Sequence, residues 1–174
     1  MATYDEYVRF KNNKPTAQME FRTFEVFHPS SPNPLRFVRD YSPLIATLES
    51  TAPRNAGQTV TFQPFSGNII ESAQASDAEQ AITIEVMDIL GVMQDYLDGF
   101  TTREDWMAQI EVVYRKYWSG DLSQPATPAE YLFAQMPSFE SGEDMMYSFT
   151  ATDADLSQKR AGILYDPKNF PGTN

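Results

Sequence analysis

The chain has 174 residues, no cysteine, one histidine, and 24 acidic against 13 basic residues, which gives a formal net charge of −11. This length suits one domain with a buried core. The missing cysteines exclude disulfides, thiolate nucleophiles and cysteine-held zinc or iron–sulfur sites, and a single histidine excludes a multi-histidine metal site within one chain. The acidic balance disfavours broad binding to a nucleic-acid backbone, so no specific nucleic-acid binding is expected.

The N-terminal residues are not expected to form a targeting segment. Residues 1–10 include Asp5, Glu6 and Arg9 and contain no apolar core, so no signal peptide is expected. The most apolar neighbourhood, residues 81–93, is interrupted by acidic side chains, so no membrane insertion is expected. Residues 4–10 could form one or two amphipathic helical turns that dock on a neighbour.

Alternation of apolar and polar residues with a period of two dominates the rest of the chain. Such alternation, in β-branched and aromatic residues, is typical of half-buried strands. The expected strands are 19–27, 35–40, 59–63, 82–86, 110–118, 131–136 and 147–152. The first of them has apolar residues on both faces and is expected to be the more buried one.

One helix is expected after the strand at 82–86. Apolar residues between Ile89 and Leu97 recur at three- and four-residue steps, and Gly99 follows at a plausible C-terminal cap. The elements together predict a mainly β protein, an antiparallel β-sandwich or a partly open barrel with one inserted helix and extended termini. The expected divisions are an N-terminal arm at 1–18, a single β-rich domain at 19–165 and a C-terminal arm at 166–174.

The negative charge is concentrated in two segments without a single basic residue. One lies between Arg54 and Arg103 and the other between Lys116 and Lys159, and each contains seven acidic residues. Solvated loops that keep the protein soluble are one interpretation. The other is a surface of one sign that repels a polyanion or meets a basic partner.

No catalytic, cofactor or metal site emerges from the motifs. His28 precedes Pro29 at the end of a strand and is interpreted as a hydrogen-bonded turn residue rather than a general base. Asp153 and Asp155 do not begin a complete calcium loop, because Gln158 and Leu164 stand where such a loop needs Gly and Glu. The acidic turn around Gly142 is interpreted as exposed and at most a loose cation site. Its acidic residues are Glu140, Glu143 and Asp144.

Two further groups have a functional and a structural interpretation. Tyr114, Tyr117 and Trp118 could stack on a sugar or base. The favoured interpretation is that Tyr114 and Trp118 pack in the core while Tyr117 faces a neighbour in the sheet. Glu85 and Asp88 are interpreted as favouring the start of the following helix. Carboxylate pairs for glycoside hydrolysis depend on spacing in three dimensions, which the sequence leaves open. Because no catalytic or cofactor motif is found, the chain is expected not to be an enzyme and to have no cofactor.

The succession of several segments resembles a known family. Phe24–Pro29 ends a strand in His-Pro, and the strand Leu35–Asp40 follows. Thr59–Phe65, Ala81–Val86 with a helix, and the C-terminal run Tyr165–Gly172 complete the order. This pattern is similar to that of uncharacterised phage proteins grouped with the minor tail protein L of lambda-like tailed phages, over most of the chain.

The resemblance implies a structural protein of the phage tail tip, between the end of the tail tube and the central hub or fibre, built on a β-sandwich module. It implies a symmetric ring of this chain, three-fold favoured and six-fold possible, in contact with other tail-tip, tube and fibre or hub proteins. Lambda-type relatives carry an additional C-terminal domain that binds an iron–sulfur cluster through cysteines. Because this chain has no cysteine, it is expected to be a short form without the cluster.

Two functions are therefore expected, ahead of a third, a hydrolase that relies on carboxylates alone. The first is a non-enzymatic tail-tip component of the virion, made in the host cytoplasm, in which an acidic segment lines a channel compatible with DNA passage. The alternative is a β-sandwich module that binds a carbohydrate or receptor through Tyr114, Tyr117 and Trp118.

Overall fold

The alternating segments form one mixed sheet in the structure, a computed structural model that describes residues 4–13, 18–71, 81–87, 91–135, 140–141 and 146–152. Ten strands belong to this sheet within the described residues. They are β1 (Glu20–Phe27), β2 (Leu35–Val38), β3 (Leu44–Thr47), β4 (Thr59–Pro64), β5 (Ser66–Glu71), β6 (Ala81–Met87), β7 (Gln109–Trp118), β8 (Glu130–Gln135), β9 (Glu140–Ser141) and β10 (Met146–Thr152).

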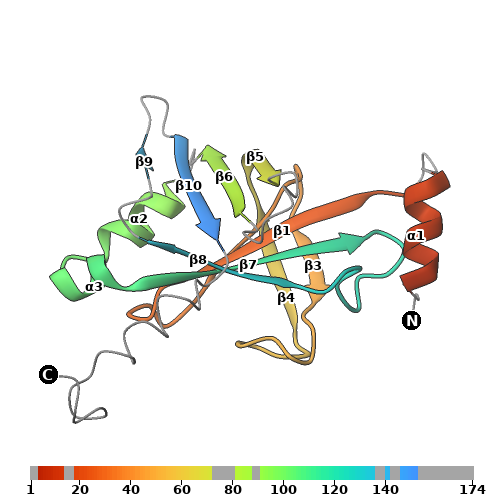
Figure 1. The fold of residues 1–174 in the computed structure, drawn as a ribbon, viewed down its shortest axis with the longest axis horizontal. Helices are drawn as coiled ribbons and strands as arrows, with labels where there is room; N and C mark the ends of the chain where they lie inside the picture. The colour runs from red at the N-terminus through yellow and green to blue at the C-terminus, as the bar shows by residue number, and fades with distance from the viewer. Residues whose placement is uncertain are drawn as a thin grey trace, which may run out of the picture.

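The strand order is β3-β4-β2-β1-β7-β8-β10-β6-β5, and β9 pairs with β10 (Figure 1). The pairings are antiparallel except for that between β2 and β4, which is parallel with Phe37 opposite Gln63. The long pair of β1 and β7 forms the middle of the sheet, with Glu20 opposite Trp118 and Phe27 opposite Glu111. A wholly antiparallel sheet was expected, and the parallel pair is a local departure from it.

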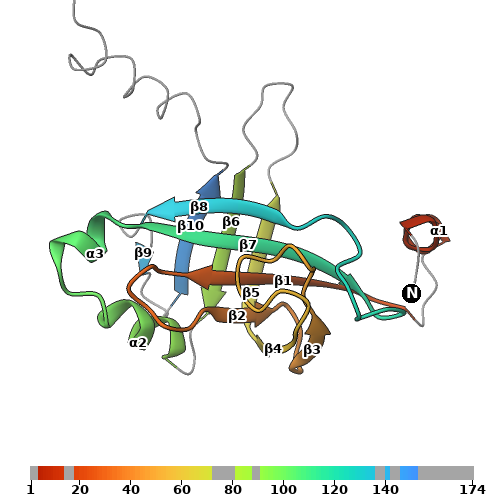
Figure 2. The same ribbon diagram turned by 90° about the horizontal axis from the view of Figure 1, so that it is seen from below.

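The mixed sheet folds over on itself around the main core. β5, β6 and β10 cross β1, β7 and β8 steeply, as Figure 2 shows. Between these layers lies a cluster of apolar side chains drawn from seven strands, among them Phe24, Ile84 and Phe149. Phe65 is the single residue between β4 and β5, and its backbone N–H donates to the Val38 carbonyl of β2 at 3.0 Å. This bond holds the start of β5, the last strand in the order, beside β2.

A second apolar cluster lies on the opposite face of β1 and β7. Along β7, Ile110, Val112 and Tyr114 enter the first cluster, whereas Tyr117 packs against Phe62 of β4 in the second one. This split follows from the two-residue period of a strand, because odd and even positions face opposite sides. β1 and β7 are therefore covered on both faces, which explains why β1 is as buried as its sequence predicts.

Helices lie at the two ends of the molecule (Figures 1 and 2). α1 (Tyr4–Asn13) lies at one end. α2 (Val92–Asp98) and α3 (Arg103–Met107) both connect β6 to β7 at the other end. Gly99 caps α2 as expected. In the described residues, no helix is long and apolar enough to cross a membrane.

The mainly β class is confirmed, and each of the seven expected strands is present. The short strands β3, β5 and β9 and the helix α3 were not expected. α1 is longer than the predicted turns and packs on its own chain, with Tyr7 buried. Residues 14–17, 88–90 and the C-terminal arm at 166–174 lie outside the described residues.

Candidate functional site

A cluster of buried charges lies on the face of β1 and β7 that the second apolar cluster also occupies. The side chains of Glu25 on β1 and Arg115 on β7 are both fully buried. The loop between β3 and β4 covers them and supplies Glu49 and Arg54. Glu25, Arg115 and the neighbouring Thr23 share this face because they follow the odd positions of their strands.

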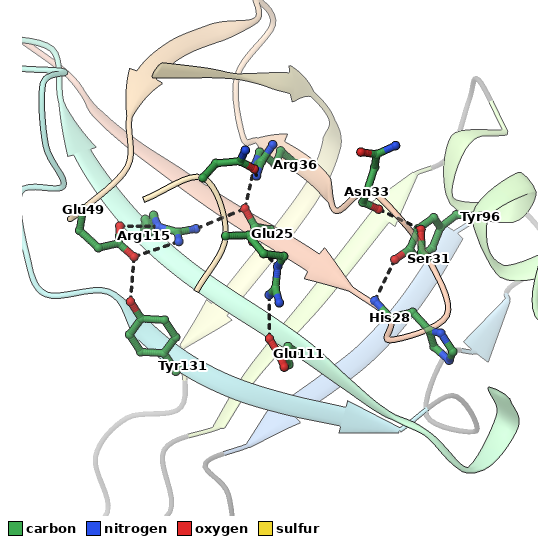
Figure 3. Close-up of polar contacts among 12 residues, drawn as sticks. Glu25, His28, Ser31, Asn33, Arg36, Glu49, Tyr96, Glu111, Arg115 and Tyr131 are labelled. Atoms are coloured by element: carbon green, nitrogen blue, oxygen red, sulfur yellow. Dashed lines mark hydrogen bonds and ion pairs between the residues drawn. The ribbon is translucent and has the colours of Figure 1, made fainter. Parts of the chain in front are cut away.

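Arg115 is held by two carboxylates. Its Nε and Nη2 donate to the two carboxylate oxygens of Glu49 at 2.8 and 2.9 Å, a bidentate contact, and its Nη1 lies 3.9 Å from Glu25 (Figure 3). The hydroxyl of Tyr131 donates to the same Glu49 at 2.8 Å. Bidentate arginine–carboxylate pairs are strong and geometrically specific, so this contact fixes the β3–β4 loop on the sheet.

Glu25 is surrounded by further cations. Arg36 of β2 donates to it at 2.7 Å, and Arg54 of the loop lies at 3.4 Å. Arg54 also donates to Glu111 at 2.7 Å and its guanidinium stacks 3.7 Å from the centre of the Phe27 ring. A carboxylate with several cationic partners is stable in a buried position, where an isolated charge would be costly.

The cluster is organised for structure rather than proton transfer. Burial acts to raise the pKa of Glu49, but the hydrogen bonds and charge of Arg115 outweigh it and hold this pKa below its usual range. Both oxygens of Glu49 already accept hydrogen bonds. An ionised carboxylate whose oxygens are occupied is a poor general base, so the site is suited to binding and rigidity.

A cavity of about 690 Å³ opens beside this cluster, at the α1 end of the molecule. Its walls include the aromatic side chains of Tyr4, Tyr7, Trp118 and Tyr131 and the loop at 121–129. Among the described residues that line it, the charged ones are both acidic, Glu49 and Asp121. The volume lies within the range of about 300–1,000 Å³ typical of ligand pockets, and the aromatic walls suit an apolar guest with a cationic edge.

A second ionic group attaches α1 to the sheet. The Tyr7 hydroxyl donates to Glu20, which also pairs with Lys11. Burial and the contact with Glu20 raise the pKa of Tyr7, so the phenol stays protonated and can donate. Two residues further along the same face of β1, Arg22 lies near Glu71, which accepts from Tyr114 and Lys116 at 2.8 Å each. These last contacts extend the ionic group along the sheet. The contacts of Tyr7 and Lys11 with Glu20 hold α1 where Tyr4 and Tyr7 line the cavity.

His28 lies at the opposite end, where it joins the β1–β2 turn to α2 and α3. Its Nδ1 accepts from the Ser30 backbone N–H at 3.1 Å, which leaves the proton on Nε2, and this nitrogen donates to the Asp105 carbonyl at 3.0 Å. Its ring stacks on Phe100 at 3.8 Å, and its backbone N–H donates to the Tyr96 hydroxyl at 2.9 Å (Figure 3). His28 is therefore a hydrogen-bonded turn residue, as its sequence context indicates.

The aromatic residues proposed for stacking are largely internal. Tyr114 and Tyr117 are buried in the two apolar clusters, whereas Trp118 is half-buried and lines the cavity. The structure thus contradicts a platform made of all three. Core packing is confirmed for Tyr114 but is wrong for Trp118, and Tyr117 is fully buried in the second cluster. Of the remaining residues considered, Glu85 accepts from Asn68 at 3.1 Å. Asp88, Glu143, Asp144, Asp153 and Asp155 lie outside the described residues, and the side chain of Glu140 is not described.

The described side chains contain no group of three or more His, Cys, Asp or Glu residues arranged to hold a metal ion. The sequence did not reveal the buried cluster or the cavity, because their residues come from segments far apart in the chain. Glu25 and Arg115 are 90 positions apart but lie on adjacent strands. A charged residue within an apolar strand, as at both positions, is the signal that could have suggested a buried pair.

The fold and the site define a mainly β protein with a ligand-sized cavity and a rigid internal ionic cluster. Residues 10–162 match the model of the family described as "Domain of unknown function (DUF1833)". This match covers most of the chain, so the chain belongs to that family. No curated protein and no solved structure matches it.

Proposed function

We propose that this protein is a structural component of a bacteriophage tail tip, a minor tail or hub-ring protein that joins the end of the tail tube to the hub or fibre. The resemblance to tail proteins related to minor tail protein L suggests the setting. The observation that carries an assembly role is the exposure of large apolar side chains at both ends of the molecule. Met107 and Trp106 at the α3 end are 76% and 47% exposed, and Tyr4 at the α1 end is 66% exposed.

Exposed apolar groups of this size mark contact surfaces when they gather at defined places. Here they lie on helices fastened to a rigid sheet, so they can bind a partner at little cost in ordering. The Glu49 carboxylate, whose two oxygens are occupied and whose pKa is lowered by Arg115, supports a structural role over a catalytic one for the buried cluster. The partners in this proposal are further copies of the chain in a symmetric ring and the neighbouring tube, hub and fibre proteins.

The acidic segments retain a place in this proposal. Asp95 and Asp98 of the first segment are exposed on α2, which lies at the α3 end. Glu71 of the same segment is instead paired with Lys116. An exposed acidic face that lines a channel would repel DNA and let it pass without binding.

Mass spectrometry of purified particles tests the proposal. Particles made from a genome that encodes the chain should contain it in a small, fixed number of copies per particle. A genome with a stop codon early in its gene is the control, and it should yield incomplete, non-infectious particles. Absence of the chain from intact, infectious particles would contradict the proposal.

The carbohydrate-binding alternative is weakened because two of its three aromatic residues are buried. A binding module would have to use Trp118 and the tyrosines at the cavity instead. Saturable binding of the purified chain to a glycan array, abolished by Trp118→Ala, together with absence from particles, is the result that would favour this alternative.

A further inference from the structure

The α3 helix presents a small apolar knob at one end of the molecule. Arg103, Trp106 and Met107 lie at positions i, i+3 and i+4 of α3 and therefore share one face. All three are exposed, and Met107 is one of the most exposed large apolar residues described. We call these three residues the α3 knob.

The knob is held rigidly although α3 has only five residues. Thr102 and Asp105 form a capping box, in which the Thr102 hydroxyl accepts from the Asp105 backbone N–H and the Asp105 side chain accepts from the Thr102 backbone N–H. The Ser30 hydroxyl donates to Asp105 at 2.6 Å, and His28 donates to the Asp105 carbonyl. These bonds fix the position of α3 and leave its Trp106 face exposed. A fixed, exposed face suits a binding element better than a mobile loop does.

The cavity lies at the other end of the same molecule. Tyr4 and Tyr7 of α1 line it, and Figures 1 and 2 place α1 and α3 at opposite ends of the long strands β1 and β7. The knob of one chain therefore cannot enter the cavity of the same chain. The cavity is mainly apolar, and its described charged lining residues are Glu49, whose charge is already matched by Arg115, and the acidic Asp121. The charged member of the knob is the cation Arg103.

We propose that the α3 knob inserts into the cavity of a second copy of this chain. Trp106 and Met107 would pack against the aromatic wall formed by Trp118 and Tyr131, and Arg103 would face Asp121. Such a contact joins two different surfaces, so it is heterologous and repeats head to tail, and it closes into a ring when the rotation per copy allows. This contact rests on the tail-tip proposal for its biological setting. It adds to that proposal the surfaces through which copies of the chain meet.

Site-specific crosslinking is a direct test, because the natural chain contains no cysteine. We mix full-length Met107→Cys chains with full-length Ala129→Cys chains at high concentration and treat them with a short bis-maleimide. Ala129 is a residue that lines the cavity. The matched control replaces Met107→Cys with Tyr41→Cys, which is 98% exposed and lies outside the knob. The expected result is a crosslinked heterodimer several-fold more abundant in the first mixture than in the control.

Trp106→Ser in the Met107→Cys chain should return the yield to the control value, while circular dichroism shows that the fold is retained. Equal yields in the two mixtures, including no crosslinking in either, would overturn the proposal. Crosslinking between two Met107→Cys chains in preference to the mixture would also overturn it, because it indicates a knob-to-knob contact. Capture of Met107→Cys by another tail protein in particles, without the heterodimer, would assign the knob to that protein instead.

The two proposals fail in different experiments. If the heterodimer forms but intact particles lack the chain, the knob-to-cavity contact stands and the tail-tip function falls. If particles contain the chain but the heterodimer does not form, the tail-tip function stands and this contact falls.

Discussion

Replacing Arg115 by methionine removes the cation at the centre of the buried cluster and leaves a side chain of similar length. Removal of one partner from a buried ion pair costs about 3–5 kcal/mol, since the remaining charge is left without compensation. In this protein Glu25 keeps Arg36 at 2.7 Å, and Glu49 keeps its hydrogen bond from Tyr131 and is 16% exposed. We therefore expect Arg115→Met to cost about 3 kcal/mol of unfolding free energy, near the lower limit.

Thermal and urea unfolding monitored by circular dichroism measure this loss. For a chain of this size about 3 kcal/mol corresponds to a fall in Tm of roughly 6–12 °C. Arg39→Met is the matched control, because the Arg39 side chain is exposed and donates a hydrogen bond of 3.2 Å to the exposed Asn68. It should change the stability by less than about 0.5 kcal/mol.

A double-mutant cycle with Glu49→Gln separates the pair from its surroundings. The double variant should be more stable than the sum of the single losses predicts, by about 1–3 kcal/mol, because the second change no longer leaves an unpaired charge. Additive losses, or an Arg115→Met variant within about 1 kcal/mol of the natural protein, would refute the reasoning.

The same pair predicts a dependence on pH. The pKa of Glu49 lies below its ordinary value of 4.5 in the folded protein, so its stabilising contribution is complete above pH 4.5 and is lost as the pH falls through the lowered value. The difference in stability between the natural protein and Glu49→Gln should therefore shrink on acidification. A difference that stays constant between pH 7 and pH 3 would contradict this account.

Three further outcomes test other parts of the structure. Gly67→Ala should cost about 2–4 kcal/mol of unfolding free energy, measured with urea, because its added Cβ would lie 1.8 Å from the Glu85 carbonyl oxygen. Gly57→Ala, with open space around it, should cost about 1 kcal/mol. Equal losses would contradict the predicted clash. His28→Ala should accelerate hydrogen exchange over residues 100–107 by releasing α3, and unchanged exchange there would show that the contact is dispensable. Burial raises the pKa of Tyr114 and of Tyr117 above the ordinary value of 10, so stability should be lost as the pH rises above 10, and both phenols should ionise, by absorbance near 295 nm, only on unfolding.

The strands were predictable because each has a local signal. The alternation of Ile82, Ile84 and Val86 follows the period of a strand that faces a core on one side, and the structure buries these three residues. β3 was missed because its four residues give little pattern, and β5 was missed because it contains Gly67 and Asn68, which are poor strand formers. Their pairing with β4 and β6 stabilises them, and this tertiary contribution is invisible in a local pattern.

The site was less predictable than the fold. His28 was interpreted correctly because a histidine before proline has a local structural explanation. Glu49, Tyr131 and Trp118 meet only because the β3–β4 loop folds over β7 and β8, and no spacing in the sequence encodes that approach. The exposure of Met107 and Trp106 depends equally on how α3 is placed by the turn after β1.

The central proposal is that copies of this chain join end to end in a phage tail tip. Imaging the tail ends of purified particles at side-chain resolution tests it most directly. We predict a ring of this chain at the distal end of the tail tube, with Trp106 of each copy inside the cavity bounded by Trp118 and Tyr131 of the next. Tail tips in which the chain is absent, or in which neighbouring copies meet with both cavities empty, would contradict it.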